Sequence, residues 1–463
     1  MLNYLMPTLS VIAVLFCLKA GAHVSSISAV LTSESKPFSL HAGIHGVQYF
    51  SESTSDSKFQ QQAQIEGQFE DSKNFLVKAH GFAGTFSTPK SSYYGVPELY
   101  IGRALGAPEN TIILGRKIEN FSFLDRQQNL GLFNPYFSND MIHYKEQGLI
   151  GLHANSRVSV FGIYGGFFPY YIPNQGPQVY EEDGEIRSSN RWAQRPPTQF
   201  RFGTQNREII YAIRDYEIDE IVKNAGSAIS IFIGKAATRP WVKASYTRKP
   251  VNQIPLSRET FGTASNFVGQ VKLSPVVTYN QVQSVDFNMD SGRFKTTWSY
   301  LEDRVENQTA LEDETLQFLA PLKMYGLWIA TDLSDFFDRR FVTEISYAQL
   351  HDGEIKDLLA DGRPSLFTFS SQRSLFKNPF RIKFESELFF VNDRPLSSAF
   401  AWTFDQLYQG TLFSGSLRYE AVAQMNINFG FDLLGVEEEQ AETHFLQEQQ
   451  ANDRVYGGLE YVF

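Results

Sequence analysis

The sequence predicts an all-β fold, a single closed antiparallel transmembrane β-barrel of about 18 strands, with 16 as the alternative count. Three observations predict it. The chain begins with an apolar segment typical of a secretory signal, continues with strand-length segments in which apolar and polar residues alternate, and ends in an alternating strand whose last residue is Phe463. Strands of this kind satisfy all their backbone amides in lipid only when the sheet closes on itself.

The composition is compatible with such a barrel. The chain of 463 residues contains 40 Phe and 22 Tyr, and charged residues make up 20 % of it. The mean hydropathy is −0.27, and no internal apolar run reaches the ~18 residues of a transmembrane helix. Barrel strands place apolar side chains towards lipid and polar ones towards the lumen, so their mean hydropathy cancels. A soluble all-β protein would have a similar composition.

The N-terminal segment predicts export. Leu9 to Leu18 is apolar and is followed by Ala20-Gly21-Ala22, which resembles a signal-peptidase site. We therefore expect a signal peptide over residues 1–22 and His23 as the first mature residue. The n-region is atypical because no Lys or Arg precedes Lys19, and the alternative is a short membrane anchor.

The only cysteine, Cys17, lies in the predicted signal peptide. A lipoprotein signal needs a small residue before the cysteine, and this chain has Phe16 there. The mature chain would therefore lack disulfides, zinc thiolates and a cysteine nucleophile. Loss of Lys19 would take the net charge from −10 to −11, and such an acidic chain is a poor nucleic-acid binder.

Alternation is clearest in two segments. In Phe59 to Glu70, the aromatic and aliphatic residues share one face, and four Gln and two Glu share the other. Phe380 to Phe390 places Phe and Ile opposite Arg, Lys and Glu in the same way. Dividing the 441 mature residues by roughly 24 residues per strand and connection gives about 18 strands. An even count keeps both termini in the periplasm.

The final strand, Asp453 to Phe463, resembles the last strand of Gram-negative outer-membrane β-barrels of the porin type. Its outward-facing residues end in Tyr461 and Phe463, and the resemblance implies that these two are the signal recognised by the barrel-assembly machinery. It covers the last strand closely and the remaining chain by its pattern of strands. It also implies residence in outer-membrane lipid, and it allows a homotrimer or a complex with a partner protein.

Three segments are too long for tight turns: 117–144, 168–200 and 435–452. The third precedes the final strand, so it should lie outside the cell, and its acidic, Gln-rich sequence favours a short helix. Long ordered loops cap a barrel or fold into its lumen. The alternative is that they are flexible surface loops.

The inferred lumen has charges of both signs. The candidate channel-lining residues are Lys78, Arg103, Arg116, Arg293, Lys295, Arg381, Lys383, Glu385, Glu387, Arg418 and Glu420. Rows of opposite charge would orient polar solutes and set ion preference, although a slip of one residue in register would reverse every assignment.

Arg103 and Arg116 follow glycines in a segment that is similar to alginate-export-like and other substrate-specific porins. The resemblance implies a substrate-selective role for the two arginines. The alternative is that they hydrogen-bond loop carbonyls inside the barrel and hold the loop in place.

Catalysis is not expected. The chain has no G-x-S-x-G or H-E-x-x-H motif. His41 and His45 share a strand face about 13 Å apart, too far for one zinc ion, and with His80 they are interpreted as solvated lumen residues. We therefore expect no enzyme activity, no cofactor and no metal. Trp298, Trp328 and Trp402 are candidates for the interfacial aromatic girdle.

The predicted function is passive diffusion of small hydrophilic solutes through an outer-membrane porin-like channel. The alternative is a non-conducting or plugged barrel that serves as an outer-membrane anchor or as a component of a partner, export or adhesion complex.

Overall fold

The computed structural model describes residues 38–51, 59–71, 75–87, 90–176, 179–188, 190–193, 196–202, 204–214, 216–235, 239–262, 269–306, 308, 314–359, 361–363, 373–436 and 445–463. The predicted signal peptide, residues 1–22, and His23 lie outside this part of the chain.

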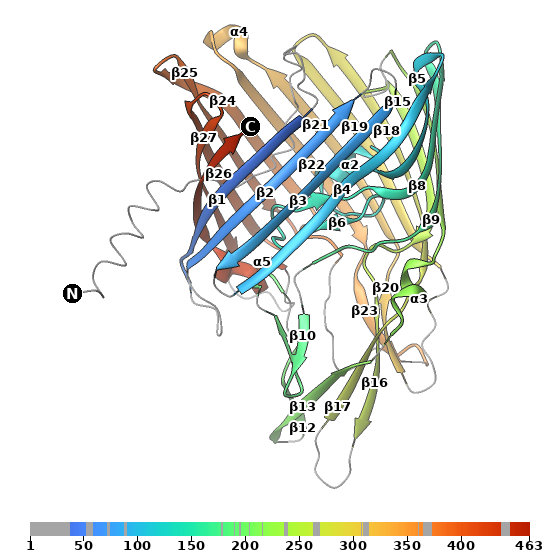
Figure 1. The fold of residues 1–463 in the computed structure, drawn as a ribbon. Coiled ribbons are helices and arrows are strands. Elements are labelled where there is room, and N and C mark those ends of the chain that lie inside the picture. The colour runs from blue at the N-terminus through green and yellow to red at the C-terminus, as the bar shows by residue number, and fades with distance from the viewer. Residues whose placement is uncertain are drawn as a thin grey trace, which may run out of the picture.

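Eighteen strands form one closed antiparallel barrel (Figure 1). They are β1 (Phe38–Tyr49), β2 (Phe59–Asp71), β3 (Leu76–Ser87), β4 (Lys90–Leu105), β5 (Ala107–Lys117), β8 (Leu149–Val158), β9 (Phe161–Tyr170), β14 (Gly226–Ile233), β15 (Val242–Pro250), β18 (Tyr279–Ser291), β19 (Phe294–Val305), β21 (Leu322–Asp332), β22 (Phe341–Asp352), β24 (Pro379–Val391), β25 (Arg394–Asp405), β26 (Gly410–Val422), β27 (Met425–Val436) and β28 (Arg454–Val462). The ring closes because β1 pairs with both β2 and β28. The predicted fold, a single closed antiparallel barrel of about 18 strands, is confirmed.

The outward face of the barrel is apolar. Ile65, Leu114 and Trp298 are 56 %, 61 % and 61 % exposed on it, as expected for side chains that face hydrocarbon. Their neighbours in the strands, such as Gln64 and Glu66, line a hollow inside the barrel instead. No helix among the described residues is long and apolar enough to cross a membrane.

The predicted aromatic girdle holds for two of its three tryptophans. Trp298 and Trp402 are exposed on the outward face, but Trp328 is only 3 % exposed. Its Nε1 donates a hydrogen bond to Glu344 Oε2 at 3.2 Å, and its ring packs beside Phe123. Trp328 shares the inward strand face with the buried Met324. The expected outward direction of Trp328 was therefore wrong, because the register of this strand differs by one residue from the one expected.

The two ends of the barrel differ in the length of their connections. At one end the turns are short, as at Gly106 between β4 and β5 and at Asn392-Asp393 between β24 and β25. All three residues have positive φ, as tight hairpin turns require. This end also holds the C-terminal end of β28 and the short helix α4 (Ser334–Phe337). The long connections all lie at the opposite end.

Three of the long connections overlap the predicted loops, although with other bounds. The first spans 118–148, between β5 and β8. The second spans 171–225, between β9 and β14, and the third spans 437–453, between β27 and β28. They hold the elements α2 (Phe123–Gln127), β6 (Tyr136–Phe137), β7 (Lys145–Glu146), β10 (Val179–Glu182), β11 (Glu185–Ser188), β12 (Gln199–Phe202), β13 (Gln205–Ile213), α3 (Ile218–Val222), α5 (Phe445–Gln449) and η1 (Gln450–Asn452).

A second sheet projects from the long-loop end of the barrel (Figure 1). Its six strands are β12, β13, β17 (Gly269–Pro275), β16 (Leu256–Gly262), β20 (Glu314–Leu319) and β23 (Ile355–Leu359), in that order. They come from four connections, and β13 and β17 pair in parallel. A small core of Ile186, Ile209, Tyr211 and Leu273 and the buried ion pair of Arg258 with Asp357, at 2.8 Å, hold this sheet. Sequence analysis did not predict it.

The first half of connection 118–148 fills one side of the lumen with an apolar core. Phe121, Leu124, Leu130, Leu132 and Phe133 are each at most 5 % exposed. They form one cluster with inward residues of the wall: Leu149, Tyr164, Phe168, Ala228, Val282, Leu301, Leu322, Met324, Ala348 and Leu350. Figure 1 shows α2 and β6 inside the barrel. The apolar cluster of the wall between β8 and β22 is therefore covered, and the open part of the lumen lies beside the docked connection.

The packing of Phe133 should control whether this connection stays docked. Phe133 is 1 % exposed and stacks on Phe121 with ring centroids 5.2 Å apart. Phe133→Ala should remove about 3–5 kcal/mol of docking free energy and make the peptide bond after Arg126 sensitive to trypsin. The control is Phe161→Ala, which removes an outward ring that is 60 % exposed. Equal resistance of both variants to trypsin would contradict the assigned core.

Candidate functional site: the lumen around connection 118–148

Asp125 organises the docked connection from within. Its Oδ1 and Oδ2 accept hydrogen bonds from the backbone N–H groups of Leu132 and Phe133 at 2.9 and 3.0 Å. These contacts close a tight loop after α2. Asn252, which follows β15 in the wall, donates from Nδ2 to the Gly131 carbonyl at 2.7 Å. Burial is the main cause that raises the pKa of Asp125 to about 6, against the two backbone N–H groups, which lower it.

The second half of the connection crosses to the opposite wall, where three ion pairs hold it. Lys145 Nζ lies 2.5 Å from Glu66 Oε2 on β2. His143 Nε2 lies 3.0 Å from Asp432 Oδ2 on β27. Asp140 Oδ2 lies 2.7 Å from Arg454 Nη1 on β28. Burial disfavours the charged form of His143, but Asp432 and Asp140 together raise its pKa above the ordinary value. The connection thus spans the lumen from one side to the other.

Two large hollows remain beside the connection. We call them the basic hollow, of about 760 Å³, and the vestibule, of about 620 Å³. The residues that line both are His80, Lys145, Ala399, Ser416 and Tyr456. The two hollows therefore meet beside Lys145, and its ion pair with Glu66 lies at the junction.

The basic hollow is lined by an excess of positive charge. Six Lys or Arg side chains face two carboxylates there: Arg126, Lys145, Arg239, Lys295, Arg381 and Lys383 against Glu146 and Glu344. Four of the cations are engaged by carboxylates: Arg126 by Glu146 at 3.1 Å, Lys145 by Glu66 at 2.5 Å, Arg239 by Asp290 at 2.8 Å and Lys383 by Glu385 at 2.6 Å. Arg381 Nε has no hydrogen-bond acceptor among the described residues. The rings of Phe123, Tyr144 and Trp328 line the same hollow.

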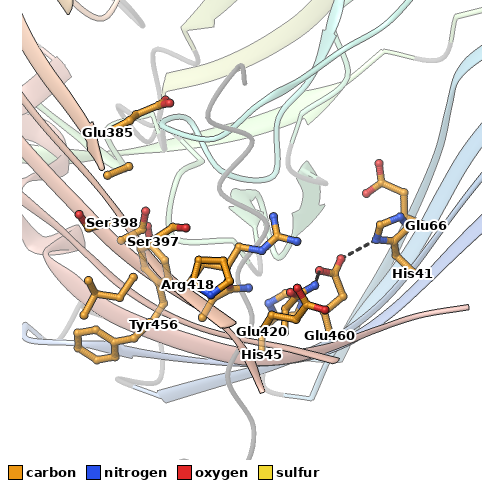
Figure 2. Close-up of a pocket in the computed structure, with 18 of the residues that line it drawn as sticks. His41, His45, Glu66, Glu385, Ser397, Ser398, Arg418, Glu420, Tyr456 and Glu460 are labelled. Carbon is orange, nitrogen blue, oxygen red and sulfur yellow. Dashed lines mark hydrogen bonds and ion pairs between the residues drawn. The ribbon is translucent and has the colours of Figure 1, made fainter. Parts of the chain in front are cut away.

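The vestibule has the opposite balance. Five Glu residues line it with three Lys or Arg: Glu66, Glu385, Glu387, Glu420 and Glu460 with Lys145, Arg340 and Arg418. Figure 2 shows His41 joined to Glu460, with Arg418 and Glu420 close by and Ser397 and Ser398 on the facing wall. The distance from His41 Nδ1 to Glu460 Oε1 is 2.8 Å. His80 Nε2 lies 2.7 Å from Glu66 Oε1, so Glu66 binds both His80 and Lys145.

The structure brings seven of the predicted channel residues to these hollows and an eighth to the inward face of the wall. Lys295, Arg381 and Lys383 line the basic hollow, and Glu385, Glu387, Arg418 and Glu420 line the vestibule. Lys78 Nζ lies 2.6 Å from Glu98 Oε2 on the neighbouring strand. Lys383 and Glu385 also bind each other at 2.6 Å. The predicted alternation of β24 and β26 therefore has the register that the sequence indicated.

Three predicted residues lie elsewhere. Arg103 pairs in register with Ile112, and Arg116 pairs with Leu99, so both start from the outward face. Arg116 Nε donates to the Gly148 carbonyl at 3.1 Å and so contacts the end of connection 118–148. The alternative interpretation expected such a bond from both arginines and from inside the barrel, whereas Arg116 makes it from the outward face. Arg293 is at the short-turn rim, 2.7 Å from Asp335. The reason is again register, which a short Gly-Arg motif does not define.

Several lining residues were missed by sequence reasoning. Lys145, Glu146, Arg126 and His143 belong to a connection without strand alternation, and Arg239 lies in a turn. Their position depends on how the connection docks, and no local pattern reports that.

The two predicted assembly residues lie at the end of β28. Tyr461 and Phe463 are 41 % and 55 % exposed, with ring centroids 4.6 Å apart.

Comparison with known proteins gives distant structural likenesses. No family model and no curated protein matches the chain. Among solved structures, the chain is similar to Acinetobacter baumannii OccAB4, with 10 % identity over 92 % of this chain and 97 % of that one, at a TM-score of 0.43. It is also similar to Pseudomonas aeruginosa OccK5 (OpdH), with 9 % identity over 92 % of this chain and 96 % of that one, at a TM-score of 0.44. A third similar structure is Salmonella typhi OmpF, solved in complex with daunomycin, with 9 % identity over 92 % of this chain and 97 % of that one, at a TM-score of 0.39.

The buried carboxyl of Asp125 should make the stability depend on pH. Its folded pKa of about 6 exceeds the ordinary value, so the contribution is fully present below pH ~4 and is lost as the pH rises through ~6. We expect about 3 kcal/mol less unfolding free energy at pH 7 than at pH 4 from this group. Urea titrations followed by tryptophan fluorescence measure it. In Asp125→Asn, the unfolding free energy should change much less between pH 4 and pH 7. The same pH dependence in this variant as in the unchanged chain would contradict the assignment.

Proposed function

We propose that the chain is a porin-like channel of the bacterial outer membrane, through which small hydrophilic solutes diffuse passively. The observation that supports this most is the pair of hollows, which adjoin at Lys145 inside a closed barrel and are lined by charged and polar side chains. The apolar outward face supports a site in lipid. This reading includes cleavage of residues 1–22 and recognition of Tyr461 and Phe463 by the barrel-assembly machinery.

We further propose that the two hollows select solutes by charge in succession. The basic hollow, with six cations and two carboxylates, attracts anions and the carboxylate or phosphate groups of solutes. The vestibule has two more carboxylates than Lys and Arg side chains. Fixed charges of a lumen act over about 8 Å at physiological salt, and the hollows share His80 and Lys145. A solute at the junction is therefore acted on by both hollows, and by one of them alone only further away.

A plugged barrel is the second candidate, and one observation favours it. At the long-loop end, Trp192 and Leu446 are 4 % and 0 % exposed and pack with Leu434. Arg191 holds this cluster by donating from Nε to Asn452 Oδ1 at 3.0 Å and from Nη2 to the Ala451 carbonyl at 2.8 Å. Such a cover could close the lumen and serve a partner protein instead of a solute. The proposed homotrimer is independent of this choice.

Single-channel recording in planar bilayers separates the two functions. The channel reading predicts stepwise conductance of the intact chain, because water and ions occupy the polar hollows. The plugged reading predicts no steps until residues 168–200 are deleted. Silence of both the intact chain and the deletion variant, each shown to be folded by its heat-modifiable mobility, would exclude a conducting function.

Reversal potentials in a salt gradient test the basic hollow. Arg381→Gln with Lys383→Gln removes two of its six cations and should lower the anion-to-cation permeability ratio by roughly two- to tenfold, as expected for a loss of about 0.5–1.4 kcal/mol. The matched control is Arg293→Gln with Arg339→Gln, which removes two cations outside both hollows. If the control changes the ratio as much as the test variant does, the selectivity arises from overall charge.

A further inference from the structure

The outward wall of the barrel has a row of cations on neighbouring strands at the long-loop end. Arg248 on β15, Arg304 on β19 and Lys323 on β21 form this outer cationic row. Their side chains are 52 %, 63 % and 49 % exposed. Gln281 of β18 lies between the arginines, in register with both. All three cations alternate with buried inward neighbours such as Leu322, so they belong to the face that also holds the apolar band.

The carboxylates that pair with the row lie on the same outward face, where Glu302 is in register with Gln283 and Lys323. Arg304 Nε binds Glu302 Oε1 at 2.7 Å, and Lys323 Nζ lies 3.9 Å from the same oxygen. Arg248 binds Glu306 through Nε and Nη2 at 3.0 and 2.8 Å. Glu302 and Glu306 are only 5 % and 19 % exposed. The acidic groups are therefore covered, while the cations remain accessible.

Three neutral donors also engage these carboxylates. Gln283 Nε2 and the Tyr300 hydroxyl donate to Glu302 at 2.5 and 2.9 Å, and Gln281 Nε2 donates to Glu306 at 2.7 Å. A guanidinium has five N–H groups, and these contacts use one of Arg304 and two of Arg248. The remaining N–H groups suit a tetrahedral anion, because arginine binds phosphate oxygens in pairs.

The surroundings of the row place it at the boundary between lipid and water. Tyr246, Tyr325 and Tyr347, on three strands of the same sector, are 37 %, 51 % and 37 % exposed on this face. Further towards the short turns, the face shows Phe287 and Trp298, at 54 % and 61 % exposed. The order from hydrocarbon side chains through tyrosine to cations is the order of a membrane interface.

Three cations gather on strands β15, β19 and β21 of one sector. At the corresponding ends of β26 and β27, the outward residues are Thr411 and Leu433, which are paired into the same sheet, and on β5 a single cation, Arg116, starts from the outward face. The grouping of three cations in one sector suits a ligand with more than one negative charge.

We propose that the outer cationic row binds the phosphate groups of an anionic lipid headgroup in the outer leaflet, with Arg248, Arg304 and Lys323 as its phosphate ligands. This inference rests on the proposed outer-membrane location but not on conduction. The glutamines and tyrosines next to the row supply donors for the polar remainder of the headgroup.

Lipid binding to the purified full chain tests the proposal, with native mass spectrometry in detergent as the readout. The probes are diphosphoryl lipid A, the same lipid without phosphates, and inorganic phosphate. The test variant replaces Arg248, Arg304 and Lys323 by Gln. The matched control replaces Arg293, Arg339 and Arg363 by Gln, which removes three exposed cations of other surfaces with the same change of net charge.

We expect the intact chain and the control to bind diphosphoryl lipid A, and the test variant to bind it at least roughly tenfold more weakly. Dephosphorylated lipid should bind the intact chain no more tightly than it binds the test variant. Excess inorganic phosphate should not displace the phosphorylated lipid from the intact chain. Equal binding by test variant and control would overturn the proposal. So would full displacement by inorganic phosphate, which would make the row a site for the free ion.

Two further measurements keep the result interpretable. If the triple variant does not fold, Arg304→Gln alone should give an intermediate loss of lipid binding, and no loss would count against the row. A change in the number of subunits without a change in lipid binding would assign the row to a protein contact and reject the lipid. Failure of the channel to conduct, with row-dependent lipid binding intact, would reject the transport function alone.

Discussion

The pairing of β1 with β28 is the constraint on which the structure depends, because it leaves the barrel without a free edge. Lipid offers no partner for an exposed backbone amide, so the sheet has to close. Closure gives every strand residue one of two directions, towards lipid or towards the lumen. Gly43 opposite Glu460 and Ala42 opposite Tyr461 in the closing register set those directions at the seam. The charges of the vestibule follow from this alternation.

A barrel of this size would leave a wide aqueous lumen if its wall were polar all round. In this chain, the wall between β8 and β22 carries an apolar cluster on its inner side, and connection 118–148 covers that cluster with five buried side chains. The apolar core and the polar hollows therefore depend on each other, because docking on one side confines water to the other. The Asp125 carboxyl stabilises the docked loop through two hydrogen bonds, although its own burial is unfavourable. Because this loop holds the connection in place, the shape of the lumen depends on one tightly packed turn.

The sequence was sufficient for the features that alternation determines. Phe59 to Glu70 and Phe380 to Phe390 lie in β2 and β24 with the expected faces. In such strands the apolar residues point outwards and the polar residues point to the lumen, so the residue type alone predicts the direction. Prediction failed where direction depends on register with a partner strand, as at Trp328 and Arg103. The six-stranded sheet was missed for another reason. Its strands are short and come from separate connections, so only tertiary contacts such as Arg258 with Asp357 define it.

The candidate site was predictable in its wall but not at the junction of the two hollows. Glu66 belongs to an alternating strand, whereas Lys145 comes from a connection whose sequence does not reveal where it docks. At their contact, one carboxylate binds both Lys145 and His80, and this cluster lies where the two hollows meet. A cation held by a wall carboxylate is partly neutralised, so Lys145 presents less positive charge at the junction than a cation without such a partner would. Arg381, whose Nε has no acceptor among the described residues, is not neutralised at that atom. In the proposed channel, an anion drawn into the basic hollow would therefore meet a smaller attraction at Lys145, where the two hollows meet.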